Sequence, residues 1–175
     1  MHDRHSLLVL GGARSGKSIF AEERCSGEPG EKIYLATAQP HDEEMQMRIQ
    51  QHQERRGDDW MLLEEPLELV GALEGNAAAG RTILVDCITL WISNLMMNDG
   101  DVAGEVAKLS DLLPSLAGNV VLVSNEVGLG IVPDNALARA FRDEAGLANQ
   151  ILADMAHEVV FMAAGLPLWL KGRRN

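Results

Sequence analysis

Residues 11–18 read GGARSGKS, and this stretch decides the fold. It fits the pattern of glycine, four residues and then Gly-Lys-Ser that forms phosphate-binding loops. The residues of the loop are Gly11, Gly12, Ala13, Arg14, Ser15, Gly16, Lys17 and Ser18. Its glycines let successive backbone N–H groups turn toward phosphate oxygens, where a side chain would obstruct them. Lys17 would bring a positive charge to the β- and γ-phosphates, and the Ser18 hydroxyl would bind Mg²⁺.

The residues on either side of this stretch have the pattern that a phosphate-binding loop requires. Residues 6–10, SLLVL, form a short apolar run typical of a buried strand, and residues 18–23, SIFAEE, begin a predicted helix. The amino end of that helix adds a partial positive charge to the anion site. A chance match in a glycine-rich loop is the alternative interpretation, and the flanking strand and helix disfavour it. The sequence therefore predicts that the chain binds a nucleoside triphosphate or a close analogue.

Length and composition are those of an ordinary globular enzyme. The 175 residues suffice for one domain with a sizeable core, and 46% of them are hydrophobic while 23% are charged. The formal net charge of −11 disfavours general attraction to nucleic acid or anionic lipid. No apolar run approaches the roughly 18 residues of a membrane span, and the amino terminus lacks signal-peptide organisation. We therefore expect a cytoplasmic enzyme with small-molecule substrates.

Short apolar runs alternate with segments of helical pattern along the chain. The predicted strands are residues 7–10, 32–36, 82–87, 119–124, 158–163 and 166–170. The predicted helices are residues 17–25, 42–56, 67–73, 90–97, 103–116 and 135–156. Most of the strands are continuously apolar, as in parallel sheets that are covered on both faces. The alternation predicts a single α/β domain over residues 1–175, with a mainly parallel sheet flanked by helices.

The residues that follow the predicted strands are candidates for nucleotide binding, because open α/β sheets bind ligands beyond the carboxyl ends of their strands. Asp86 ends the run ILVD, the usual form of a Walker B carboxylate that holds Mg²⁺ directly or through water. The alternative is a carboxylate that caps the next helix. Thr37 could line the site or cap a helix. Glu126 could be a catalytic acid or base, a substrate contact or an organiser of its loop.

A histidine in the predicted helix over residues 42–56 gives a more discriminating signal. Arg48, His52 and Arg56 are spaced four residues apart and so share one helix face, and Arg55 lies three residues from His52. Arginine neutralises phosphate oxygens, and neutral imidazole can attack phosphorus to form a phosphoramidate. From the spacing alone, a solvated charged face is the competing interpretation.

Five blocks of the sequence stand in the order found in one known family. They are GGARSGKS (11–18), IYLATAQ (33–39), DEEMQMRIQQHQERR (42–56), DCITLWISNL (86–95) and SNEVGLGIVPDNALARAFRDEAGLANQ (124–150). Together they resemble the bifunctional cobinamide kinase/cobinamide-phosphate guanylyltransferase family over nearly the whole chain. The last block is far more specific than the phosphate loop. With that loop, the resemblance implies an α/β fold of the P-loop NTPase type with a RecA-like sheet.

The resemblance implies two reactions in the late assembly of cobalamin. Members of the family phosphorylate the aminopropanol hydroxyl of adenosylcobinamide with ATP or GTP. They then transfer GMP from GTP onto that phosphate, which gives adenosyl-GDP-cobinamide and pyrophosphate. The second reaction passes through a guanylyl-histidine, and the matching residue here is His52. A covalent intermediate divides GMP transfer into two displacements, each with a good leaving group.

The resemblance also implies a nucleotide site, with Lys17 and His52 as its catalytic residues and Ser18 and Asp86 as its Mg²⁺ ligands. The phosphates of GTP would lie in the loop at residues 11–18. The other matching positions are Ala36, Thr37, Ala38, Gln53, Glu54, Arg55, Arg56, Glu64 and Asp86. Carboxylates suit guanine, whose N1–H and N2 amino groups are donors, and either Glu64 or Asp86 could contact the base.

Two positions depart from the family's pattern. Arg56 is followed by Gly57, where the family commonly has Arg-Pro a few residues after the histidine, and we expect a more flexible helix end. Gln51 stands where some relatives have a second histidine, which leaves His52 as the unambiguous nucleophile. The resemblance further implies a homo-oligomer, a trimer, whose histidine helix moves toward the phosphate loop when nucleotide binds.

Two other functions remain as alternatives. One is a P-loop small-molecule kinase without guanylyl transfer, and the intact His52 argues against it. The other is a GTP-binding regulatory module, whose switch loops would respond to the γ-phosphate. The sequence contains no Asn-Lys-x-Asp motif for guanine specificity, which disfavours this second alternative.

Overall fold

The computed structural model describes residues 4–39 and 59–172. The strands are β1 (Arg4–Gly11), β2 (Glu31–Ala36), β3 (Trp60–Glu64), β4 (Arg81–Asp86), β5 (Gly118–Asn125), β6 (Glu158–Ala163) and β7 (Leu166–Lys171). The helices are α1 (Lys17–Ser26), α3 (Leu69–Asn76), α4 (Ile88–Met97), α5 (Val102–Leu112) and α6 (Ala136–Met155). The predicted helix over residues 42–56 lies outside the described residues, and with it lie His52, Gln53, Glu54, Arg55 and Arg56.

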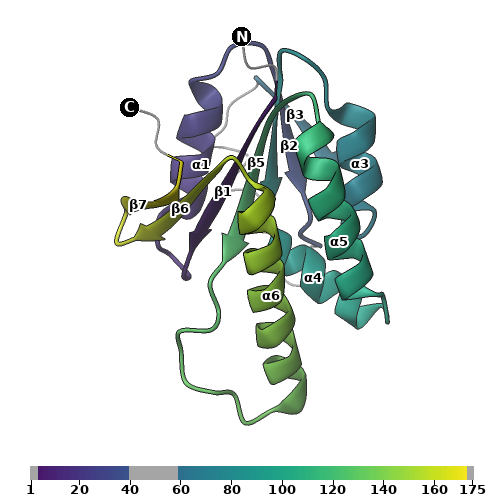
Figure 1. The fold of residues 1–175 in the computed structure, drawn as a ribbon, viewed down its shortest axis with the longest axis vertical. Coiled ribbons are helices and arrows are strands. Elements are labelled where there is room, and N and C mark those ends of the chain that lie inside the picture. The colour runs from purple at the N-terminus through teal and green to yellow at the C-terminus, as the bar shows by residue number, and fades with distance from the viewer. Residues whose placement is uncertain (1–3, 40–58, 173–175) are drawn as a thin grey trace.

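The seven strands in the described part of the chain form one sheet in the order β3-β2-β4-β5-β1-β6-β7 (Figure 1). Every neighbouring pair is parallel except β6 and β7, which form an antiparallel hairpin at one edge. Parallel strands need crossover connections, and in the described residues helices follow β1, β3, β4 and β5. The predicted α/β class, with a mainly parallel sheet flanked by helices, is confirmed.

Alternation along the strands divides the core into two layers, one on each face of the sheet. In β1, Leu8 and Leu10 face the layer made with α3, α4, α5 and α6, while Leu7 and Val9 face the layer made with α1. Trp91 of α4 is fully buried in the first layer. Each large apolar side chain buried in this way stabilises the fold by about 1.5–3 kcal/mol. The two layers therefore hold both faces of the sheet rigid beneath the loops at its ends.

The edge strand β3 was missed in the prediction from the sequence. It pairs with β2 alone in the sheet order, and its side chains are half-buried or exposed, with Met61 58% and Leu62 42% exposed. Its apolar run, Trp60 to Leu63, spans four residues between acidic neighbours. A run of that length does not distinguish a strand from a helical turn.

The described helices follow the predicted ones with shifted ends. The helix predicted over residues 103–116 ends at Leu112, because Pro114 lacks the N–H that would continue it and lies in a 3-10 turn. The longest predicted helix is confirmed as α6, and the Asn135 side chain caps it by accepting from Ala138 N–H at 3.1 Å. None of the helices in residues 4–39 and 59–172 is long and apolar enough to cross a membrane.

Candidate active site

The phosphate loop lies at the carboxyl edge of the sheet, between β1 and α1 (Figure 1). β1 ends at Gly11, and α1 begins at Lys17. Gly16, the residue before the helix, has φ +94°, a left-handed conformation that glycine adopts without steric penalty. Ala13 and Arg14 are exposed at the tip of the loop. The stretch thus joins a buried strand to the amino end of a ten-residue helix, whose partial positive charge favours bound anions.

The turn between β6 and β7 packs against the phosphate loop and supports it. The N–H of Gly165 in this turn donates to the Ser15 carbonyl at 2.9 Å. A Cβ atom added at Gly16 would lie 3.1 Å from Gly165 Cα, and one added at Gly11 would lie 2.8 Å from the Met162 carbonyl oxygen. Gly11 and Gly16 are therefore required by the close approach of the β6–β7 hairpin as well as by the shape of a phosphate loop.

Lys17 has its ammonium group folded back onto the phosphate loop. Its Nζ donates to the Gly12 carbonyl at 2.9 Å, and the residue is 8% exposed. Burial lowers the pKa of Lys17, whereas the nearby Cys87 and Asp86 act to raise it. The ammonium therefore lies within electrostatic reach of the Asp86 carboxylate, at the point where phosphate oxygens would need a cation.

Asp86 lies at the end of β4, on the same edge of the sheet as the phosphate loop. Strand β5 separates β4 from β1 in the sheet order. The Tyr34 hydroxyl donates to Asp86 Oδ2 at 2.8 Å. Helix α4 begins after Cys87, whose own side chain makes no capping hydrogen bond. Asp86 is therefore a carboxylate at the strand end, held by a phenol from the neighbouring strand.

Thr37 lies just beyond β2, and its side chain faces inward. Its side chain is fully buried; its hydroxyl donates to the Cys87 carbonyl at 2.7 Å and accepts from the Cys87 N–H at 2.9 Å. These two bonds join the segment after β2 to the segment after β4. Ala36 ends β2 beside Asp86, and Ala38 is half-buried just beyond. In this stretch, the backbone and the small alanine side chains could line a nucleotide pocket.

Glu64 lies farther from the phosphate loop than Asp86 does. It ends β3 and is exposed, and both carboxylates pair in register with Ala36 of β2 between them. Neighbouring strands are about 4.8 Å apart, so the two strand ends are separated by roughly 10 Å. The structure thus brings Asp86 close to Lys17, while Glu64 lies at the outer end of the same edge.

The end of β5 carries a polar network that the sequence interpretation did not identify. Asn125 pairs in register with Gly11, and its Nδ2 donates to Thr89 Oγ1 at 2.7 Å. Asn149 of α6 donates to the Asn125 carbonyl at 3.2 Å and accepts from Ser124 Oγ at 2.7 Å. Two polar residues at the end of an apolar strand were the available signal. Their partners come from α4 and α6, which spacing along the chain does not reveal.

Glu126 shapes the loop that follows β5. Its backbone N–H donates to the Gly11 carbonyl at 2.9 Å, which ties this loop to the phosphate loop. Its carboxylate accepts from the Gly128 N–H at 2.5 Å. Of the three roles considered for Glu126, these bonds support that of a loop organiser.

The donor set at this edge of the sheet suits Mg²⁺. The cation prefers oxygen ligands, keeps several waters, and is usually held by one or two protein groups together with substrate phosphates. The Ser18 hydroxyl and the Asp86 carboxylate, the predicted ligands, would supply oxygen atoms of this kind. No cluster of three or more His, Cys, Asp or Glu side chains suited to a metal occurs in residues 4–39 and 59–172. A metal held mainly by protein groups is therefore not indicated within those residues.

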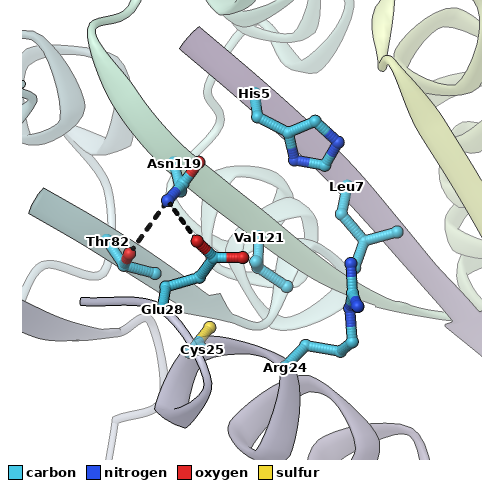
Figure 2. A pocket seen from close by; sticks show the side chains of 8 residues that line it. All are labelled: His5, Leu7, Arg24, Cys25, Glu28, Thr82, Asn119 and Val121. Carbon is cyan, nitrogen blue, oxygen red and sulfur yellow. Dashed lines mark hydrogen bonds between the residues drawn. The ribbon is translucent and has the colours of Figure 1, made fainter. Parts of the chain in front are cut away.

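A small pocket lies at the opposite, amino edge of the sheet (Figure 2). It is lined by His5, Leu7, Arg24, Cys25, Glu28, Thr82, Asn119 and Val121. Its polar groups bond to one another: Asn119 Nδ2 donates to Glu28 at 3.4 Å and to Thr82 at 3.3 Å, as Figure 2 shows. Because open α/β sheets bind ligands at their carboxyl edge, this pocket is not the nucleotide site.

Comparison with known proteins agrees with the fold and with the motifs. Residues 7–170 match the family model described as cobinamide kinase / cobinamide phosphate guanyltransferase. The chain is 49% identical over 168 residues to the bifunctional adenosylcobalamin biosynthesis protein CobP of Pseudomonas aeruginosa, covering 94% of this chain and 96% of the relative. It is 39% identical to the CobU protein of Salmonella typhimurium, described in the same words, covering 94% of this chain and 99% of the relative.

A solved structure supports the fold independently of sequence similarity. The P4 protein of bacteriophage phi6, solved in complex with ADP, superposes with a TM-score of 0.51 at 15% identity, over 93% of this chain and 52% of that one. The P-loop NTPase type of fold is thus confirmed, as is the family resemblance recognised in the five sequence blocks. The chain belongs to the cobinamide kinase/cobinamide phosphate guanyltransferase family.

Proposed function

We propose that this chain phosphorylates adenosylcobinamide with ATP or GTP and then transfers GMP from GTP onto the product. The observation that carries the proposal is the buried Lys17, folded onto the phosphate loop within electrostatic reach of Asp86, in a chain of this family. The relatives named CobP and CobU, which this chain matches over nearly their whole length, support the same pair of reactions. Both reactions begin with a bound triphosphate, so one phosphate loop can serve both.

In the kinase reaction, the backbone N–H groups of residues 11–18 would bind the β- and γ-phosphates. Lys17 would exchange the Gly12 carbonyl for phosphate oxygens, which are stronger partners for an ammonium group. Ser18 and Asp86 would hold Mg²⁺, which would neutralise charge that develops on the phosphates. The aminopropanol hydroxyl of the corrinoid then attacks the γ-phosphorus, and its proton leaves as the bond to the nucleoside diphosphate breaks.

In the transfer reaction, an imidazole nitrogen of His52 would attack the α-phosphorus of GTP. A nitrogen–phosphorus bond forms, and the bond to the β-phosphate oxygen breaks, which releases pyrophosphate. The phosphate of adenosylcobinamide phosphate then attacks the same phosphorus and restores the free histidine. Lys17 and the phosphate loop would stabilise the pyrophosphate as it leaves.

We also infer a homotrimer, as the family resemblance implies, and a cytoplasmic location, as expected from the sequence. Exposed apolar side chains on β7 support an oligomer: Leu166 is 71%, Leu168 60% and Leu170 57% exposed. They alternate along the strand and so lie on one face of it. Burying them against another subunit would remove this apolar surface from water.

Incubation with GTP labelled at the α-phosphate tests the proposal. We expect label to be retained on the denatured protein through an acid-labile bond, and to be lost in His52→Ala. The matched control is His41→Ala, which removes another histidine of the same region and should retain the label. A kinase without guanylyl transfer would phosphorylate adenosylcobinamide yet take up no label. A regulatory module would do neither, and a wild-type chain that takes up no label would overturn the transferase half.

A further inference from the structure

The side chain of Tyr34 makes a direct contact with the acidic residue of the proposed metal site. Tyr34 belongs to β2 and is 6% exposed. Its hydroxyl donates to Asp86 Oδ2 at 2.8 Å, across 52 residues of sequence. Hydrogen bonds to charged groups contribute about 1.5–3 kcal/mol, more than bonds between neutral groups. A buried phenol that donates to a strand-end carboxylate can therefore hold that carboxylate in one orientation.

Strand alternation explains why these two side chains meet. Tyr34 pairs in register with Leu84, and both face the α1 side of the sheet. Asp86 follows Leu84 by two residues and so projects to the same side. Lys17, the first residue of α1, is placed over that side as well, within electrostatic reach of Asp86. The phenol, the carboxylate and the ammonium thus converge on one face of the sheet, at its carboxyl edge.

The phenol itself is held by its neighbours. The ring of Trp60, at the start of β3, packs edge-on against the Tyr34 ring with centroids 6.4 Å apart and an interplanar angle of 77°. Such edge-to-face pairs are worth about 0.5–1.5 kcal/mol beyond the area they bury. Because Tyr34 is buried and packed in this way, its hydroxyl reaches Asp86 from a fixed position.

We propose that Tyr34 is a positioning residue, whose hydroxyl orients the Asp86 carboxylate toward the Mg²⁺ of the bound nucleotide. The inference rests on the proposed function, since it assumes a metal–nucleotide complex at this edge of the sheet. On this proposal, a residue of β2 contributes to nucleotide binding indirectly, through the orientation of Asp86. Tyr34 itself does not need to touch the nucleotide.

The variant Tyr34→Phe tests this role, because it removes the hydroxyl and keeps the buried ring. Calorimetric titration with GTP, in EDTA and in Mg²⁺, measures the gain in affinity that the metal provides. We expect affinity in EDTA to stay within about twofold of wild type, while the gain from Mg²⁺ falls roughly tenfold. In the assay with corrinoid, kcat should fall and KM for the corrinoid should not change. Equal losses with and without Mg²⁺ would overturn the role.

A double-mutant cycle separates positioning from general support of the fold. If Tyr34 acts through Asp86, then Tyr34→Phe should change Mg²⁺-dependent affinity less than twofold in an Asp86→Asn background. Full additivity of the two substitutions would overturn the inference. The control Trp60→Phe leaves the Tyr34 hydroxyl in place and should keep most of the gain from Mg²⁺.

The outcomes also separate this inference from the proposed function. A wild-type chain that binds GTP with Mg²⁺ but forms no guanylyl-histidine would contradict the function and leave the role of Tyr34 standing. A fully active enzyme in which Tyr34→Phe alters neither the metal dependence nor kcat would contradict the inference alone. GTP affinity that does not respond to Mg²⁺ in the wild type would contradict the inference as well.

Discussion

The carboxyl and amino edges of the sheet both carry charged side chains, but the partners of these side chains differ. At the amino edge, the buried Glu158 carboxylate lies 3.3 Å from His5 Nε2 and 3.6 Å from an Arg24 nitrogen. At the carboxyl edge, Lys17 donates to a backbone carbonyl and Asp86 accepts from a phenol. Charges paired with one another hold the fold together, whereas an ammonium bound to a carbonyl can exchange it for phosphate.

Loss of the Lys17 ammonium should have the largest effect at the carboxyl edge. We expect kinase activity and GMP transfer both to fall roughly 10³-fold in Lys17→Ala, because both reactions need the triphosphate charge neutralised. Steady-state assays of each reaction measure the loss. The matched control is Lys32→Ala, whose ammonium donates to the exposed Gly30 carbonyl at 3.3 Å. Full kinase activity in Lys17→Ala would mean that the loop does not bind the triphosphate.

At the amino edge, the substitution Glu158→Gln should lower stability without affecting nucleotide binding. The carboxylate is buried beside the half-buried Arg24 guanidinium, so its removal breaks this ion pair and should cost about 3 kcal/mol. Urea unfolding measures this loss, and calorimetry should show GTP affinity within twofold of wild type. Glu31→Gln provides the comparison, since Glu31 pairs with Arg81 while its side chain is 69% exposed. Glu31→Gln should lower the free energy of unfolding by less than about 1 kcal/mol. Similar losses in the two variants would contradict the difference between the buried and the exposed ion pair.

The glycines of the phosphate loop should differ in their tolerance of a methyl group. Gly16→Ala should lower the free energy of unfolding by about 1–3 kcal/mol, because φ is +94° and the Cβ would lie 3.1 Å from Gly165 Cα. Gly12→Ala should change it by less than about 0.5 kcal/mol, since a Cβ there meets no atom of the described residues within 4 Å. Unfolding is measured without nucleotide. Equal losses would show that the β6–β7 turn does not constrain the loop.

The buried cysteines should have no effect on stability at neutral pH and should act only at high pH. Burial raises the pKa of Cys25, at the amino edge, to about 12 and that of Cys87, at the carboxyl edge, to about 11. The folded thiols therefore stay protonated where unfolded thiols, with a pKa near 9, already ionise. Their contribution to stability is complete below pH 9 and is lost as pH rises toward 11. Urea unfolding across this range should show that the free energy of unfolding declines with pH, and that it declines less steeply in Cys25→Ala than in the wild type. An identical dependence on pH in the two proteins would contradict the prediction.

Short sequence patterns were enough to locate the parts of the site that are formed by residues close together in the chain. The glycines and Lys17 of the phosphate loop follow a fixed spacing, and Asp86 ends an apolar run, so both could be placed at strand ends. The buried strands were recognisable because both of their faces are covered, which makes them continuously apolar. The edge strand β3, which is exposed, carries no such signal.

Contacts between distant segments could not be predicted in the same way. The hydroxyl of Thr37, for example, bonds to the backbone of Cys87, 50 residues away. Tyr34 was part of a recognised block, yet its bond to Asp86 depends on the register of β2 against β4. A single sequence does not state that register, because a shift by one residue would turn every side chain to the opposite face.

The support that the β6–β7 turn gives to the phosphate loop has a consequence for how the enzyme becomes active during synthesis. Ser15 is made early, whereas Gly165, whose N–H holds the Ser15 carbonyl, follows it by 150 residues. A nascent chain that has folded β1, α1 and β2 therefore still lacks the hydrogen bond from Gly165 that supports its phosphate loop. Competence to bind nucleotide should arise only after β6 and β7 have joined the sheet, so that unfinished chains do not capture GTP.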